Sequence, residues 1–125
     1  MAKIAVLGYG TVGSGVVEVL ETNKDSITKR AGREIEVKSV LDLRDFPGDP
    51  IQEKIVHDVD VIINDPEIEV VVEVMGGVEP AFTFVKRALE AGKSVCTSNK
   101  ALVAAHGPEL LEMAKKRNLN FMFEA

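Results

Sequence analysis

Three glycines at fixed spacing, Gly8, Gly10 and Gly13, lie between an apolar run (residues 4–7) and an amphipathic run (residues 12–20). The pattern G-x-G-x-x-G at a strand-to-helix junction is typical of a dinucleotide-binding turn. The first glycine makes the tight bend, the second lets a pyrophosphate approach the backbone, and the third lets the helix pack closely on the strand. N–H groups at the start of the helix then face the phosphates. We therefore predict that this turn binds a dinucleotide. Tyr9 lies inside the turn, with its ring either against the ligand or exposed beside it.

An acid and an arginine, Asp42 and Arg44, follow the second predicted strand (residues 34–41). At this position an acidic side chain binds a ribose 2′-hydroxyl and favours NAD, whereas an arginine pairs with a 2′-phosphate and favours NADP. Because both types occur within three residues, NAD and NADP remain equally open. The alternative is that both are ordinary polar loop residues.

Two glycines, Gly76 and Gly77, follow Met75 at the end of a nearly continuous apolar run (residues 70–75). Glycines at the end of a strand indicate close backbone approach or a positive φ, although a loop that only turns the corner would also use them. Glu73 interrupts the apolar run, and an acid is costly to bury unpaired in a central strand. We expect Glu73 to point out at the rim, to meet a cation, or to have a structural role.

Four polar residues in succession, Thr97, Ser98, Asn99 and Lys100, follow the next predicted strand (residues 94–97). A nicotinamide and its substrate are expected at this place, where a lysine can hold a carboxylate or polarise an oxygen. The alternative is a solvated lysine after a helix cap. His57 and His106 are far apart and lack metal-ligand spacing, so neither is expected to bind metal or to take part in catalysis.

Strands and helices alternate in the sequence that positions these residues. Besides the segments above, the patterns predict a helix that starts at residue 12, has an apolar stripe through Leu20 and as far as Ile27, and is capped at Gly32. They also predict a loop over 44–52, a short helix within 56–63, a helix over 81–91, a helix from Pro108 to residue 117, and a strand over 120–124. Such alternation requires parallel pairing with right-handed crossovers. The predicted fold is α/β, a doubly wound open parallel sheet of the Rossmann type with helices on both faces. Its ligands bind beyond the carboxyl ends of the strands, where all four clusters would meet.

Composition restricts the class of protein. The chain has 125 residues, which predicts a single domain over residues 1–125. Its formal net charge of −5 offers no basic surface for nucleic acid or for an anionic membrane. The single cysteine excludes an internal disulfide and favours a reducing compartment. No apolar stretch reaches the roughly 18 residues of a membrane span, and no signal-peptide pattern is present. We expect a cytoplasmic protein.

Four segments together carry a family resemblance: residues 8–15 (GYGTVGSG), 72–77 (VEVMGG), 92–103 (GKSVCTSNKALV) and 123–125 (FEA). In order and spacing they resemble the N-terminal NAD(P)-binding domain of the homoserine dehydrogenases, over the whole chain. The third segment is the most specific. The resemblance implies an oxidoreductase that interconverts L-homoserine and L-aspartate 4-semialdehyde with NAD or NADP, in the biosynthesis of threonine, methionine and isoleucine.

The resemblance also assigns roles to particular residues. It places Lys100 beside the nicotinamide and substrate as a catalytic residue, Thr11 and Val12 at the pyrophosphate, and Glu124 at a sodium ion of the full-length enzyme. The family continues beyond residue 125 into a substrate-binding and dimerisation region, so we expect a homo-oligomer at full length and no turnover by these 125 residues alone. The alternative is a non-catalytic nucleotide-binding sensor or regulatory module.

Overall fold

The computed structural model describes residues 2–22 and 35–123. Strands and helices alternate along these residues, in the order β1 (Ala2–Leu7), α1 (Thr11–Thr22), β2 (Ile35–Leu41), the 3-10 helix η1 (Pro50–Lys54), β3 (Ile55–Val56), α3 (Val59–Ile63), β4 (Ile68–Glu73), α4 (Ala81–Glu90), β5 (Ser94–Thr97), α5 (Lys100–Lys116) and β6 (Phe121–Phe123). Gly32, expected near the end of the first helix, lies outside the described residues.

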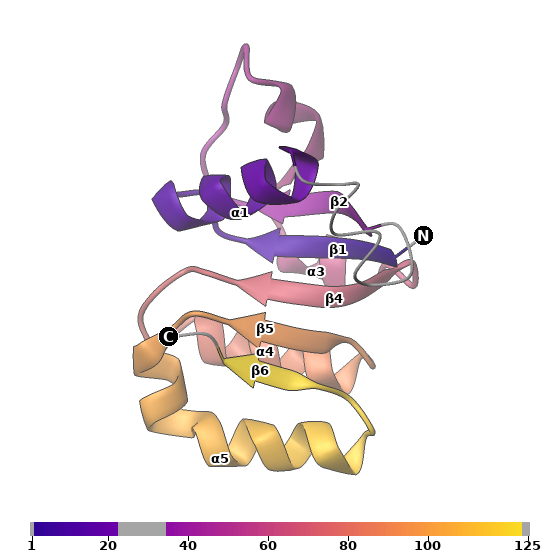
Figure 1. The fold of residues 1–125 in the computed structure, drawn as a ribbon, viewed down its shortest axis with the longest axis vertical. Coiled ribbons are helices and arrows are strands. Elements are labelled where there is room, and N and C mark those ends of the chain that lie inside the picture. Colours follow the sequence, from indigo (N-terminus) through magenta and orange to yellow (C-terminus); the bar gives the residue numbers. More distant parts are fainter. Residues whose placement is uncertain (1, 23–34, 124–125) are drawn as a thin grey trace.

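The strands of the described residues form one parallel sheet in the order β3-β2-β1-β4-β5-β6 (Figure 1). The order reverses at β1, which has β2 on one side and β4 on the other. This is the strand order of the doubly wound dinucleotide-binding fold. The predicted fold class is therefore confirmed, and the carboxyl ends of β1, β2, β4 and β5 lie along one edge.

Helices cover both faces of the sheet, so its central strands are buried on both sides. α1 lies over β1 and β2 on the near face in Figure 1, whereas α3 and α4 lie behind the sheet. Ile4 and Val6 of β1 pack in the core on the α1 side, and Ala5 and Leu7 pack with Val85 of α4 in the core on the other side. Burial on both faces explains why residues 4–7 of β1 form an uninterrupted apolar run rather than an alternating one.

β4 lies two residues earlier than the strand predicted over residues 70–75. It begins at Ile68, which pairs with Lys3 of β1, and ends at Glu73. The N–H of Val74 still donates to the carbonyl of Leu7 in β1 at 3.1 Å. The chain then turns away from the sheet, since the N–H of Met75 donates to the Glu73 carboxylate at 2.7 Å and Gly76 has a φ of +81°. The apolar character of Val74 and Met75 hid this end of the strand.

The sequence predicted the first turn of α5 at Pro108, but the helix begins eight residues earlier. Its first residue is Lys100, and the Asn99 side chain caps the helix by accepting the N–H of Leu102 at 3.1 Å. Pro108 lies inside the helix, although it has no N–H to donate to the preceding turn. The prediction was wrong because proline is also over-represented in the first turn of helices.

Two short elements were not predicted. η1 begins inside the predicted loop over residues 44–52 and ends two residues after it. The carboxylate of Asp49 caps this 3-10 helix by accepting the N–H of Ile51 at 3.0 Å. The two residues of β3 then pair with Val40 and Leu41 of β2. α3 begins only after this strand, at Val59. A two-residue strand has no recognisable periodicity, so only its pairing reveals it.

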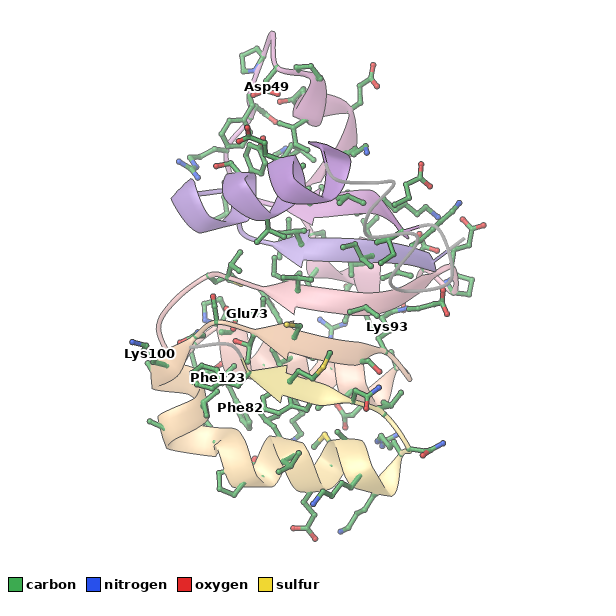
Figure 2. The ribbon with its side chains drawn as sticks, in the orientation of Figure 1. Asp49, Glu73, Phe82, Lys93, Lys100 and Phe123 are labelled. Atoms are coloured by element: carbon green, nitrogen blue, oxygen red, sulfur yellow. The ribbon has the colours of Figure 1, made fainter. Side chains whose placement is uncertain are left out.

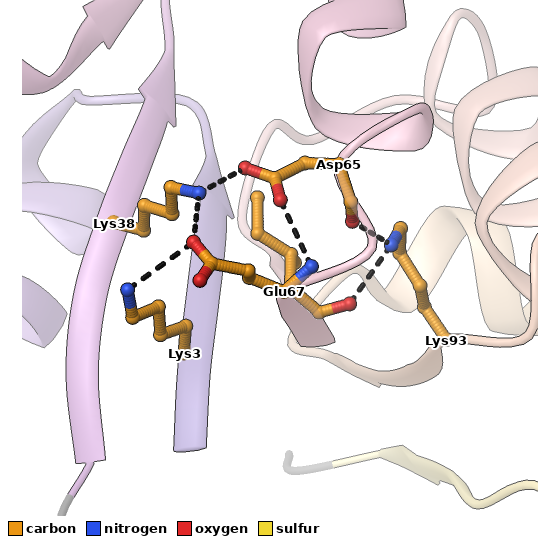
Figure 3. A network of polar contacts seen from close by, with 6 residues as sticks. Lys3, Lys38, Asp65, Glu67 and Lys93 are labelled. Atoms are coloured by element: carbon orange, nitrogen blue, oxygen red, sulfur yellow. Dashed lines mark hydrogen bonds and ion pairs between the residues drawn. The ribbon is translucent and has the colours of Figure 1, made fainter. Parts of the chain in front are cut away.

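A network of charged side chains lies at the amino ends of the strands, opposite Lys100 (Figures 2 and 3). Lys93 is almost completely buried, which lowers its pKa, and its Nζ donates to the backbone carbonyl of Asp65 at 2.6 Å. The Asp65 carboxylate pairs with Lys38 at 2.6 Å, and Glu67 joins Lys38 to Lys3. These contacts tie the loop before β4 to β1, β2 and the start of β5.

Candidate functional site

The glycine turn between β1 and α1 has the shape that its spacing predicts. Gly8 has a φ of +101°, and its N–H donates to the carbonyl of Leu41 at 2.8 Å. A Cβ on Gly13 would lie 2.0 Å from the carbonyl oxygen of Gly8, so α1 packs too closely for any side chain there. A Cβ on Gly10 would meet nothing within 4 Å. The space over Gly10 is therefore open at the start of α1.

Asp42 and Arg44 pair with each other beside this turn. Oδ1 of Asp42 accepts Nε of Arg44, and Oδ2 accepts Nη2 of Arg44, each at 3.0 Å. Oδ2 of Asp42 also accepts the N–H of Tyr9 at 3.0 Å. The Arg44 guanidinium is the main cause that lowers the pKa of Asp42 to about 2. The Asp42 side chain is 10% exposed and that of Arg44 63%, so the carboxylate is anchored while the guanidinium lies in solvent.

A cavity of about 540 Å³ opens beside the pair. It brings together several residues that the sequence predicted from separate clusters: Gly8, Tyr9, Gly10, Asp42, Arg44 and Met75. The sequence analysis missed its other lining residues: Leu41, Leu43, His57, Val59, Val74, Pro80 and Phe84. The cavity thus spans the ends of β2, β1 and β4, at the point where the strand order reverses.

His57 is the missed residue with the most polar contacts. Nδ1 lies 2.7 Å from the carbonyl oxygen of Asp42 and Nε2 lies 2.9 Å from Oδ1 of Asp45. These acceptors, the Asp42 carbonyl first, raise the pKa of His57. The contacts hold the loop that carries Arg44. The sequence analysis considered His57 only as a metal ligand or catalytic residue. Its place at the cavity follows from the strand β3, which was not predicted.

The ring of Tyr9 packs against Phe46 of the loop after β2. The two ring centroids are 5.0 Å apart with an interplanar angle of 74°, and the Arg44 guanidinium lies 5.2 Å from the Phe46 centroid. Tyr9 is half-buried. Its ring is therefore packed at the side of the cavity rather than free in solvent.

The residues expected near the nicotinamide lie outside that cavity, at the same edge of the sheet. Lys100 is exposed at the first position of α5 (Figure 2). Ser98 is also exposed, whereas the side chains of Thr97 and Asn99 are buried and bond to Glu73. Gly76 and Gly77 both have positive φ, +81° and +74°, and are exposed beside them.

The remaining expected site residues are placed only in part. Thr11 and Val12 are the first two residues of α1, directly after the glycine turn. Glu124, expected at a sodium ion, lies outside the described residues. Within residues 2–22 and 35–123 there is no group of three His, Cys, Asp or Glu side chains that could hold a metal ion. The same residues contain no helix with the length and apolarity that a membrane span requires.

Comparison with known proteins adds independent findings. A family model described as the NAD-binding domain of homoserine dehydrogenase matches residues 8–124. The homoserine dehydrogenase of Pseudomonas aeruginosa is 43% identical over 124 residues, which are 98% of this chain and 29% of the relative. That of Bacillus subtilis is 38% identical over 127 residues, again 98% of this chain and 29% of the relative.

Solved structures agree with these sequence matches. The homoserine dehydrogenase from Thiobacillus denitrificans superposes with a TM-score of 0.91 at 38% identity, over 98% of this chain and 29% of that one. The enzyme from S. aureus at pH 6.5 gives a TM-score of 0.89 at 38% identity, over 99% of this chain and 32% of that one. The chain therefore spans less than a third of the length of each of these relatives.

Proposed function

Because the chain belongs to the homoserine dehydrogenase family and matches its NAD-binding domain, we propose that it binds NAD(P) within an enzyme that interconverts L-homoserine and L-aspartate 4-semialdehyde. The observation that carries the proposal is the open space over Gly10 at the start of α1, beside the Asp42 carboxylate. Bound NAD(P) supplies the hydride chemistry that no amino-acid side chain offers. The test is a calorimetric titration of the chain with NAD and with NADP.

The cofactor-binding residues divide into two groups. The adenosine half is assigned to the cavity beside Asp42 and Arg44, with the pyrophosphate on the turn at Gly10. The nicotinamide half is assigned to the rim formed by Gly76 and Gly77 together with Ser98 and Lys100. The exposed Lys100 ammonium would orient a substrate oxygen there. Thr11 and Val12 would contact the pyrophosphate from the first turn of α1.

Asp42 and Arg44 are proposed to accept both cofactors. Asp42 would hold the ribose hydroxyl of NAD, whereas the exposed Arg44 would turn toward the 2′-phosphate of NADP. We expect Arg44→Ala to lower the affinity for NADP by about 10- to 150-fold, the equivalent of one charge-assisted hydrogen bond. The affinity for NAD should stay nearly unchanged. Asp42→Ala should lower the affinity for NAD instead. Titration of both variants with both cofactors measures the four affinities.

Arg87→Ala is the matched control for this prediction. Arg87 is also a partly exposed arginine paired with an aspartate, Asp60, but it lies on α4 and does not line the cavity. Its replacement removes the same charge without touching the proposed ribose site. An equal loss of NADP affinity in Arg44→Ala and Arg87→Ala would mean that only overall charge matters. Unchanged affinities in all four titrations would remove both Asp42 and Arg44 from the site.

We expect the chain alone to produce no NAD(P)H from homoserine. Hydride transfer requires reacting atoms held about 3–3.5 Å apart and a group that accepts the hydroxyl proton. Lys100 is exposed and does not line the cavity of about 540 Å³, so it cannot enclose a substrate by itself. Absorbance at 340 nm measures the product directly.

Supplying the remaining two thirds of a relative, fused or as a second chain, should restore turnover. Steady homoserine-dependent NAD(P)H formation by the chain alone, lost in Lys100→Ala, would contradict the expectation. Cofactor binding without turnover in the completed protein would favour a non-catalytic nucleotide-binding sensor instead.

For the full-length enzyme the proposal includes a homo-oligomer in the cytoplasm that acts on a small molecule, without nucleic-acid or membrane partners. The net charge of −5 supports the last part. A sodium ion near Glu124 rests on the family resemblance alone, and no step of the reaction is derived from it.

A further inference from the structure

Glu73 is a fully buried acid at the carboxyl end of a central strand. Its exposed fraction is 0%, and it pairs with Leu7 of β1 on one side and Thr97 of β5 on the other. A carboxylate in such a place is strongly unfavourable unless hydrogen bonds satisfy it. No basic side chain among the described residues bonds to it, so its partners must explain why an acid is present.

Within residues 2–22 and 35–123, the three groups that contact the Glu73 carboxylate are all donors. The hydroxyl of Thr97 donates to Oε1 at 2.6 Å, and the backbone N–H of Met75 donates to Oε2 at 2.7 Å. The amide nitrogen of Asn99 is a third donor, 3.4 Å from Oε2. The Thr97 hydroxyl accepts the N–H of Asn99 at 3.0 Å, which leaves its own proton for Glu73. Both carboxylate oxygens therefore act as acceptors.

The same network connects the two segments that surround the proposed nicotinamide position. Nδ2 of Asn99 donates to the carbonyl of Gly77 at 2.6 Å, and Oδ1 of Asn99 caps α5 at the N–H of Leu102. α5 begins with Lys100. Glu73 thus holds the 75–77 loop directly, and through Asn99 it holds both Gly77 and the helix start that carries Lys100.

We propose that Glu73 is a positioning residue for the nicotinamide half of the site, which it builds by fixing the 75–77 loop and the start of α5 relative to each other. The inference rests on the proposed function. A side chain that only filled the core would be apolar, because an apolar residue avoids the desolvation of a buried charge. Glu73 does not line the cavity assigned to the adenosine half and reaches it only through the N–H of Met75, so that half depends on Glu73 less than the nicotinamide half does.

Glu73→Gln tests this role with little change of volume. It replaces one acceptor oxygen with an NH₂ donor, which then faces the Met75 N–H or the Thr97 hydroxyl. We expect NAD to bind about tenfold more weakly, since one loop loses its hydrogen bond. ADP contains only the adenosine and pyrophosphate parts and meets the Glu73 network only at Met75, so its affinity should fall by less than that of NAD. Calorimetric titration with NAD and with ADP measures both.

Ile62→Val is the control for general loss of stability. Ile62 is completely buried in α3 and neither bonds to Glu73 nor lines the cavity, so this variant should lower the melting temperature without changing the ratio of NAD to ADP affinity. If Glu73→Gln weakens NAD and ADP equally, or weakens neither, the inference is overturned. If the parent chain binds neither ligand, the proposed function itself fails.

A measurement on the parent chain tests the same inference without a variant. Hydrogen exchange of the Met75 and Leu102 amides reports the two bonds that the network makes to the loop and to α5. Added NAD should slow exchange at both amides together, whereas ADP, which reaches Met75 from the cavity, should not slow exchange at Leu102. Protection of only one of them by NAD, or equal protection by ADP, would show that the two segments do not act as one unit.

Discussion

Gly13→Ala should cost the chain about 3 kcal/mol or more of unfolding free energy, because the new Cβ has no room. It would lie 2.0 Å from the carbonyl oxygen of Gly8 and 2.9 Å from the carbonyl carbon. Both atoms belong to the backbone of the turn, and Gly8 is already held by its bond to Leu41. Relief of the clash would therefore require α1 to move away from β1. Urea denaturation followed by circular dichroism measures the loss.

Gly15→Ala is the matched control, two residues further along the same helix. A Cβ on Gly15 meets nothing within 4 Å. Alanine there should stabilise the chain by about 0.5–1 kcal/mol, because glycine is unfavourable inside a helix. Equal stabilities of Gly13→Ala and the parent chain would refute the close packing of α1 on β1.

The success of the fold prediction has a local cause. Parallel strands buried on both faces are continuous apolar runs, and residues 4–7 show this pattern directly before the glycines. The positions of Asp42 and Arg44 could be predicted for the same reason, since they follow a recognisable strand. The ion pair between these two residues could not be predicted, because it depends on their side-chain rotamers and on the N–H of Tyr9, which comes from a distant part of the sequence.

The missed parts of the site depend on contacts between distant segments. Pro80 and Phe84 reach the cavity from α4, and His57 reaches it after β3, so their places follow from the strand order rather than from any local motif. The start of α5 illustrates competing local signals. Asn99 is a favourable helix cap and Pro108 is a common first-turn residue, so each indicates a different start for the helix. The hydrogen bond from the N–H of Leu102 to Asn99 shows that the helix starts after Asn99.

Gly10→Val should abolish cofactor binding while the chain stays folded. Gly10 does not have a positive φ, and a Cβ there contacts no atom within 4 Å, so valine is compatible with the empty turn. Its branched side chain would instead fill the space where the pyrophosphate must approach the backbone. The melting temperature should therefore stay close to that of the parent, whereas binding is lost. Circular dichroism and calorimetric titration measure the two effects separately.

The most direct test of cofactor binding at this turn is one calorimetric titration series of NAD and NADP into the parent, Gly10→Val and Gly15→Ala chains. Gly15→Ala makes a similar change in the same motif, on the helix rather than at the proposed phosphate position. We predict saturable binding of at least one cofactor to the parent and to Gly15→Ala, and no measurable binding to folded Gly10→Val. Equal affinities of the parent and Gly10→Val would contradict the account.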